Sequence, residues 1–207
     1  MHYDEPAIKR TIVFIDGQSL YRSAKEAFGY VYPNYDVKLL SEKICSGQGW
    51  QTSEIRFYTG VPDLQDNALW YNFWNNKLTN MGQKGVKIFS RALRYHNEKW
   101  ECPSCSKIHT SLVGHEKGID VRIALDVIRL AHEKLYDVAA IFSQDQDLSE
   151  VADEVRRISA EQTRWIKIAS AFPMSPTYKN NRGINKTDWV KIDRQTYDSC
   201  IDPNDYR

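Results

Sequence analysis

Aspartates follow two of the most apolar segments of the chain. Asp16 comes directly after Thr11–Ile15, and Asp145 and Asp147 come just after Val138–Ser143. Short apolar, β-branched runs of this kind are typical of strands that are buried on both faces of a parallel sheet. Ligands of such sheets bind outside the carboxyl ends of the strands, so we expect these acids to lie together at one edge.

A third acid lies at the start of the clearest helical segment, about Ile119–Lys134. That segment carries one polar stripe at helical spacing, made of Arg122, Asp126, Arg129 and Glu133. Asp120 projects roughly opposite the stripe, on the face of Ala124, Val127 and Ala131. A carboxylate on an inward face is costly unless it has a partner. Asp126, between two arginines, is expected to form surface salt bridges.

Clustered carboxylates repel one another, and a bound cation removes that repulsion. Mg²⁺ in proteins is typically held by few carboxylates together with water and substrate phosphates. The sequence therefore predicts a Mg²⁺ or Mn²⁺ site at Asp16, Asp120, Asp145 and Asp147. Each acid also has a purely structural interpretation: a turn residue before Gly17, a first-turn acid for Asp120, and an N-cap for Asp147.

The elements that must position these acids alternate along the chain. Expected strands cover residues 11–15, 54–58, 86–91, 137–143, 164–169 and 188–192. Expected helices cover residues 19–28, 36–45, 67–81, 119–134, 148–158 and 194–200. This alternation predicts an α/β fold with a mostly parallel central sheet and helices on both faces.

An inserted hairpin or knuckle at about 95–115 interrupts that alternation. It contains Cys-Pro-Ser-Cys, with Cys102 and Cys105 at the spacing of a zinc knuckle. Tetrahedral Zn²⁺ needs four ligands, and Cys102, Cys105, His109 and His115 form the simplest closed set. The spacing of the two histidines falls just outside the common pattern. The alternative is a hairpin with two reduced thiols.

Composition sets the broad class of the protein. The chain has 207 residues, of which 42% are hydrophobic and 27% charged, and its net charge is +1. This suits one α/β domain with extensions. A net charge this close to zero gives no overall positive field that would indicate a nucleic-acid partner. Contact with a nucleic acid would therefore be local or helped by a partner protein. The apolar runs are too short for a bilayer, and the polar N-terminus does not resemble a secretory signal, so we expect a cytoplasmic protein.

Three segments, in order, resemble the NYN domain family in its LabA-like branch: Val13–Tyr21, Glu116–Asp126 and Ser143–Leu148. The resemblance implies a PIN-like Rossmannoid fold and a divalent-metal-dependent ribonuclease acting on RNA, which we expect to be single-stranded. It implies an N-terminal extension at 1–10, the NYN domain with its inserted knuckle at 11–200, and a C-terminal tail at 201–207.

Carried over by motif, the acidic site comprises Asp16, Asp120, Asp145 and Asp147, and Ser19 stands where the family usually has Asn. The family also has an acid at Asp126, which conflicts with the surface position expected above. Asp126, Lys117 and Ser143 are therefore secondary candidates. Gln144 replaces a Gly of the family pattern, and Leu148 replaces a Phe.

Two other functions remain open. One is a non-catalytic RNA- or protein-binding module, which the change at Ser19 favours; the other is a metal-dependent phosphatase or nucleotide-processing enzyme. Arg91, Arg94, Tyr95 and the cluster Trp70/Tyr71/Trp74 offer charge and stacking surfaces to RNA, although aromatic residues at this spacing more often pack in a core. The oligomeric state is open, with a homodimer or a protein partner as candidates.

Overall fold

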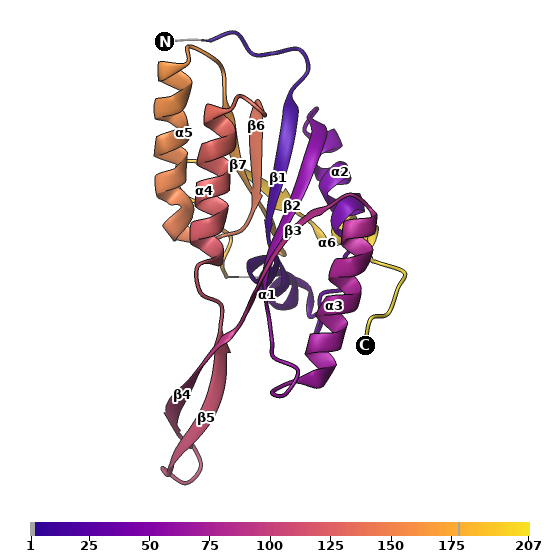
Figure 1. The fold of residues 1–207 in the computed structure, drawn as a ribbon, viewed down its shortest axis with the longest axis vertical. Helices are drawn as coiled ribbons and strands as arrows, with labels where there is room; N and C mark the ends of the chain where they lie inside the picture. The colour runs from indigo at the N-terminus through magenta and orange to yellow at the C-terminus, as the bar shows by residue number, and fades with distance from the viewer. Residues whose placement is uncertain (1–2, 178) are drawn as a thin grey trace.

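The computed structural model describes residues 3–177 and 179–207 and has one central sheet (Figure 1). All six strands of this sheet are parallel, in the order β3-β2-β1-β6-β7-β8. The strands are β1 (Arg10–Asp16), β2 (Gln51–Val61), β3 (Lys87–Ala92), β6 (Val138–Phe142), β7 (Lys167–Pro173) and β8 (Asp188–Ile192). The predicted α/β class with a parallel sheet is confirmed.

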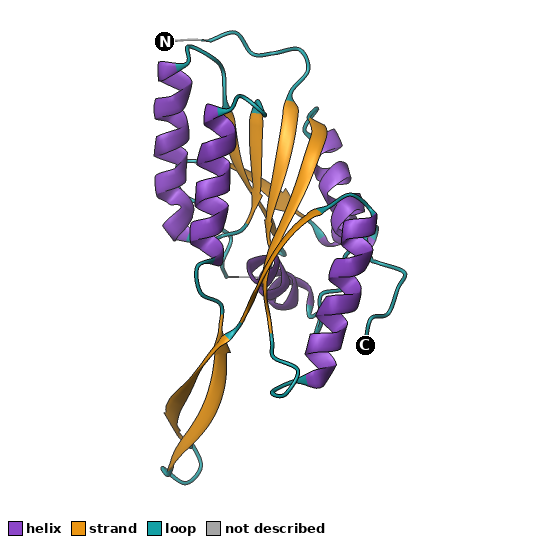
Figure 2. Cartoon of the chain, viewed as in Figure 1, coloured by secondary structure: helices purple, strands orange, loops and turns teal. Residues whose placement is uncertain are grey.

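Helices cover both faces of the sheet, as predicted (Figure 2). One face packs against α1 (Gly17–Phe28), α2 (Val37–Gly47), α3 (Ala68–Gln83) and α6 (Arg194–Asp198). The other packs against α4 (Ile119–His132) and α5 (Ser149–Glu161), with the short 3₁₀ helix η1 (Gln146–Leu148) before α5.

The central strand β1 shows why its sequence is apolar throughout. Val13 and Ile15 belong to one core cluster, while Ile12 and Phe14 belong to the other. Successive side chains of a strand point to opposite faces, so a strand with helices on both sides must be apolar at every position. The strand pairs with β2 and with β6, which places the ends of β1 and β6 side by side.

Two glycines are required at the starts of helices, Gly17 at α1 and Gly118 before α4. Gly17 begins α1 directly under the ring of Phe57, where an added Cβ would lie 2.5 Å from the ring. Gly118 precedes α4 with a φ of 74°, in the left-handed region that favours glycine. An added Cβ there would also lie 2.8 Å from the Arg91 guanidinium. Both glycines flank the acids of interest.

The expected insertion forms an antiparallel hairpin of β4 (Arg94–Glu101) and β5 (Ile108–His115). It leaves the sheet at the end of β3 and projects from the carboxyl edge, as Figure 1 shows. The turn at its tip contains Cys102 and Cys105. The chain returns from this hairpin to α4 through Glu116, Lys117 and Gly118.

The ends of the domain are held by specific contacts. Arg10 begins β1 and forms an ion pair of 3.0 Å with Asp137. Residues 201–207, expected to form a tail, pack against α3: Lys77 forms an ion pair with Asp202, and the ring of Tyr206 lies edge-on to Phe73. None of the helices within the described residues is long and apolar enough to cross a membrane.

Candidate active site

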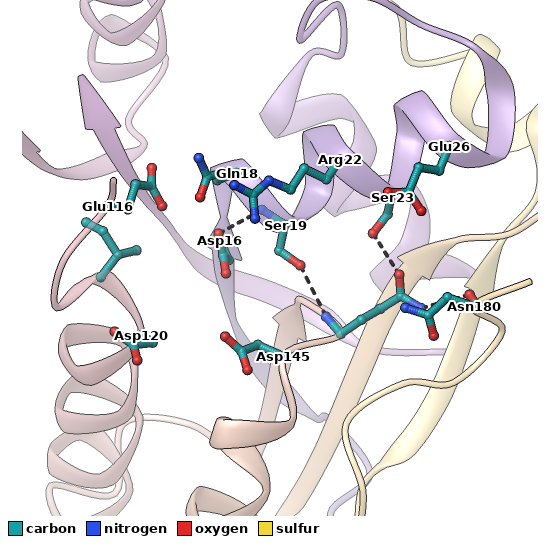
Figure 3. Close-up of a pocket in the computed structure, with 12 residues that line it drawn as sticks. Asp16, Gln18, Ser19, Arg22, Ser23, Glu26, Glu116, Asp120, Asp145 and Asn180 are labelled. Carbon is teal, nitrogen blue, oxygen red and sulfur yellow. Dashed lines mark hydrogen bonds between the residues drawn. The ribbon is translucent and has the colours of Figure 1, made fainter. Parts of the chain in front are cut away.

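A cavity of about 420 Å³ opens at the carboxyl edge of the sheet. Five acidic residues line it, of which Asp16, Glu116, Asp120 and Asp145 come together, while Glu26 lies further along α1. Figure 3 shows the carboxyl groups of these four around one hollow, although they come from the end of β1, the segment after β5, the first turn of α4 and the loop after β6. The expected convergence of acids therefore includes the strand-end residues Asp16 and Asp145 and the helical residue Asp120.

Asp16 is the most buried of these acids, with 8% of its surface exposed. Its Oδ1 accepts a hydrogen bond of 2.9 Å from the backbone N–H of Ser19, so it also caps α1. Burial raises the pKa of Asp16 to about 6; hydrogen bonds oppose this shift, and the negative charge of Asp145 adds to it. A buried carboxyl group next to a second one is the kind of group that a cation would stabilise.

Two hydroxyl groups connect Asp16 to the loop that carries Asp145. Ser143 Oγ lies 3.3 Å from Oδ2 of Asp16 and accepts a hydrogen bond of 3.1 Å from the backbone N–H of Asp145. Ser19 Oγ accepts from the backbone N–H of Gln144 at 3.3 Å and lies 3.2 Å from Ser143 Oγ. These contacts fix the ends of β1 and β6 relative to each other. Ser19 and Ser143 therefore act as positioning groups.

Glu116 was not among the predicted site residues. Its carboxylate accepts hydrogen bonds from the backbone N–H of Gly60 and from the Thr59 hydroxyl. Burial raises its pKa to about 7, against the effect of the Gly60 hydrogen bond, and the charge of Asp16 adds to the shift. Its place directly before Lys-Gly-Ile-Asp was the only signal in the sequence.

Asp147 does not line the cavity with the other acids. It is exposed in η1, and its backbone N–H donates a hydrogen bond of 3.0 Å to Oδ1 of Asp145. The expected N-cap role is also wrong, because Asp145 caps η1 and Leu148 occupies the cap position of α5. Asp147 helps to orient Asp145 through its backbone.

Gln144 has a structural role that a glycine could not fill. Its side chain accepts a hydrogen bond of 2.7 Å from Ser23 Oγ and donates to the carbonyl oxygens of Asn180 and Arg182. It therefore ties α1 and the loop before β8 to the end of β6, and it lines one wall of the cavity. Leu148, the other departure from the family pattern, is buried in the core beneath α4 and α5.

The acids fit a cation that is bound partly through water. Among the described residues, no three carboxylates have ligand oxygens that all lie within 4.8 Å of one another. Mg²⁺ typically keeps several waters and takes one or two carboxylates plus substrate phosphates, so this wider spacing suits it. Burial raises the pKa of both Asp16 and Glu116, the charge of Asp145 adds to the first shift and that of Asp16 to the second, and a bound cation would offset these effects.

The expectation of a surface position for Asp126 is wrong. It forms the expected ion pairs with Arg122 and Arg129, but its side chain is only 4% exposed. Strand β2 covers it: Tyr58 donates a hydrogen bond of 2.9 Å and Arg56 one of 3.2 Å to Oδ2. Asp126 does not line the acidic cavity.

Three of the four predicted zinc ligands lie together in the structure. Sγ of Cys102, Sγ of Cys105 and a ring nitrogen of His109 lie within 4.8 Å of one another at the hairpin tip. His115 pairs with Arg94 at the base of the hairpin, about 20 Å from His109 at the usual rise of a strand, and its Nε2 contacts Glu98 at 2.7 Å. The predicted fourth ligand is therefore wrong.

Cationic side chains lie beside the acids. Arg22 lines the cavity, and Figure 3 shows its side chain extending from α1 above Asp16. Lys117 is exposed next to Glu116. The Arg91 guanidinium donates to the Lys117 carbonyl at 3.4 Å and so braces the turn before α4. These groups offer positive charge at the rim of an acidic hollow, which suits an anionic substrate.

Residues 10–177 match the family model of the NYN domain. The chain belongs to the NYN domain family. Membership supports a PIN-like, nuclease-type function, that of a hydrolase at the coarse level, and PIN-like nucleases generally use divalent metal ions. The match begins at the first residue of β1 and includes every acid of the cavity. No curated protein matches the chain at a significant level.

Solved structures support the fold alone. A protein of unknown function from Vibrio parahaemolyticus RIMD 2210633, VPA0982, is similar with a TM-score of 0.52 and 18% identity, over 92% of this chain and 97% of that one. MurG of Acinetobacter baumannii has a TM-score of 0.33 and 12% identity, over 88% of this chain and 45% of that one. The second likeness is too distant to support an argument.

Proposed function

We propose that this NYN domain is a divalent-metal-dependent ribonuclease that hydrolyses RNA phosphodiester bonds in the acidic cavity. The observation that carries the proposal is the convergence of Asp16, Glu116, Asp120 and Asp145 on one hollow at the carboxyl edge of a parallel sheet. A structural role for each acid would not require four segments of the chain to bring carboxyl groups to the same cavity.

Asp16 and Asp145 are the proposed principal metal ligands, and Asp120 with Glu116 would hold the metal's waters or a second ion. When bound, Mg²⁺ or Mn²⁺ would neutralise phosphate charge and lower the pKa of a water molecule. The hydrogen bonds of Ser19 and Ser143 hold the strand ends in place before substrate arrives. Arg22, at the rim of the cavity, would contact another phosphate of the bound RNA.

Cleavage of labelled single-stranded RNA tests this function, with Mn²⁺, Mg²⁺ or EDTA present. We expect metal-dependent cutting by the wild type and none by Asp16→Asn or Asp145→Asn. Asp153→Asn is the matched control, because Asp153 is an exposed acid of α5 that pairs with Lys186 away from the cavity. Cutting that survives both cavity substitutions would refute the site. RNA binding without cutting by the wild type would instead indicate a non-catalytic binding module.

We also propose that the hairpin tip binds a structural Zn²⁺ through Cys102, Cys105 and His109. Thiolates and imidazole are the usual ligands of zinc in proteins, and three of them already lie together here. The fourth position would be taken by water or by another ligand. The hairpin lacks a core of its own, with Ile108 73% exposed, so a metal would help to fix its tip.

A further inference from the structure

A second cavity, of about 460 Å³, lies beside the acidic one. The two cavities share two lining residues, Gln18 and Glu116, so a single wall separates them. The volume lies in the range of roughly 300–1,000 Å³ that is typical of small-molecule sites. The position of this cavity between α1, α3 and the base of the hairpin places it directly next to the proposed metal site.

Aromatic rings make up much of its lining. Tyr21 comes from α1, Trp70 and Trp74 from α3, and Tyr95 from β4. Leu112 of β5, which is 56% exposed, adds an apolar side chain to the same cavity. Large apolar side chains in an exposed position next to a site often mark a binding surface.

The rings are held in place by contacts outside the cavity. The Tyr21 hydroxyl donates a hydrogen bond of 2.8 Å to the Val31 carbonyl. The Trp70 ring lies edge-on to Phe73 with centroids 5.0 Å apart, and Trp74 is buried in the core. Rings that are already fixed lose little conformational freedom when a ligand binds.

We propose that this second cavity is a nucleobase subsite, which holds the base of a nucleotide adjoining the phosphate in the acidic cavity. The inference rests on the proposed ribonuclease function and adds how the enzyme binds the base of its substrate. Aromatic side chains bind any base by stacking, because every base has a π face. Gln18 and Glu116 lie where the ribose-phosphate chain would pass from one cavity to the other.

The charge of the protein supports a nucleobase as the occupant. With a net charge of +1, the chain offers no general attraction for the RNA backbone. Binding energy must then come from contacts that do not depend on charge. A single well-stacked base supplies about a 5- to 150-fold gain in affinity. This contact also explains why unpaired RNA is the expected substrate, since a base within a duplex is not free to enter a cavity.

The test measures binding of a fluorescent single-stranded RNA and of the same ribose-phosphate chain without bases, by fluorescence anisotropy without added Mg²⁺ or Mn²⁺, so that no metal-dependent cutting occurs. The variants are Trp70→Ala and Tyr95→Ala. Tyr95 lies on the hairpin, outside both core clusters, so its loss leaves the main core intact. Trp100→Ala is the matched control, because Trp100 is an exposed ring on the opposite face of β4 and lies against His109.

We expect each cavity variant to weaken binding of intact RNA at least about fivefold and to leave binding of the baseless chain unchanged. Trp100→Ala should bind both ligands as the wild type does. The subsite is refuted if folded variants bind intact RNA normally, if they lose affinity for both ligands alike, or if the wild type binds no RNA. Base-dependent binding without any metal-dependent cutting would keep the subsite and reject the ribonuclease; cutting without base dependence would do the reverse.

Discussion

Substitution of the buried Asp126 is the change that best distinguishes a loss of stability from a loss of catalysis in this domain. The family pattern has an acid at this position, whereas the structure places Asp126 against β2 and outside the acidic cavity. Replacing Asp126 with Ala removes the acceptor of the Tyr58 hydroxyl and one of the two carboxylate partners of Arg56, the other being Glu54. We expect a loss of stability and no loss of intrinsic cleavage.

The size of the loss follows from which partners are exposed. Arg122 and Arg129 are 41% and 50% exposed, so their ion pairs with Asp126 are screened by water and contribute little. Arg56 is only 12% exposed, and Tyr58 is buried. Arg56 keeps its ion pair with Glu54, but the buried Tyr58 hydroxyl loses its acceptor, which costs about 1–3 kcal/mol. At about 2–4 °C per kcal/mol for a chain of this length, the Tm should fall by roughly 2–12 °C.

Thermal or urea unfolding measures this loss, and cleavage of RNA well below the Tm measures activity. Glu133→Ala is the matched control: Glu133 pairs with the same Arg129 at 2.9 Å, but at the exposed end of α4. It should cost less than about 1 kcal/mol. A stable Asp126→Ala protein, or a folded one that no longer cuts RNA, would refute the assignment of Asp126 to structure.

Three further changes test other contacts. Burial raises the pKa of Asp137, but hydrogen bonds from Arg10 outweigh it and hold this pKa below the usual 3.8. The stabilisation that these bonds give is therefore fully present above pH 3.8 and is lost as the pH falls through the lower pKa of the folded state. In urea unfolding, the difference in stability between the wild type and Asp137→Asn should narrow below pH 3.8. Cys105→Ser should lower the zinc content measured by mass spectrometry, whereas His115→Ala should not. Glu116→Gln should slow metal-dependent cleavage about 10- to 100-fold with an unchanged Tm.

The strand-end acids could be predicted because a strand that is buried on both faces appears in the sequence as an uninterrupted apolar run. A run such as Thr11–Ile15 has no polar face, so its first acid marks the point where the chain leaves the core. The same holds for Val138–Phe142 and Asp145. Adjacent parallel strands end at one edge, so identifying the two strands was enough to bring Asp16 and Asp145 together.

Contacts that depend on which surface covers a helix were not predictable in this way. The helical spacing of Asp126 correctly gave its neighbours Arg122 and Arg129, because those lie on the same helix. It could not show that Arg56 and Tyr58 of β2 would cover this stripe, because the packing of α4 on the sheet is a property of the whole fold. A charged stripe can face a buried arginine as well as solvent.

The inserted hairpin shows a second kind of limit. Spacing along the chain placed His115 near the cysteines, but antiparallel pairing with Arg94 carries it to the opposite end of the hairpin. The same pairing returns the chain to the sheet edge, and Glu116 enters the acidic cavity as a result. Tyr95, on the outgoing strand, reaches the second cavity. One insertion and the segment that follows it thus supply both a carboxylate beside the proposed metal and a ring beside the proposed base. A change in the pairing register of β4 and β5 would therefore alter the proposed catalysis and substrate binding together, whereas a longer tip would leave both in place.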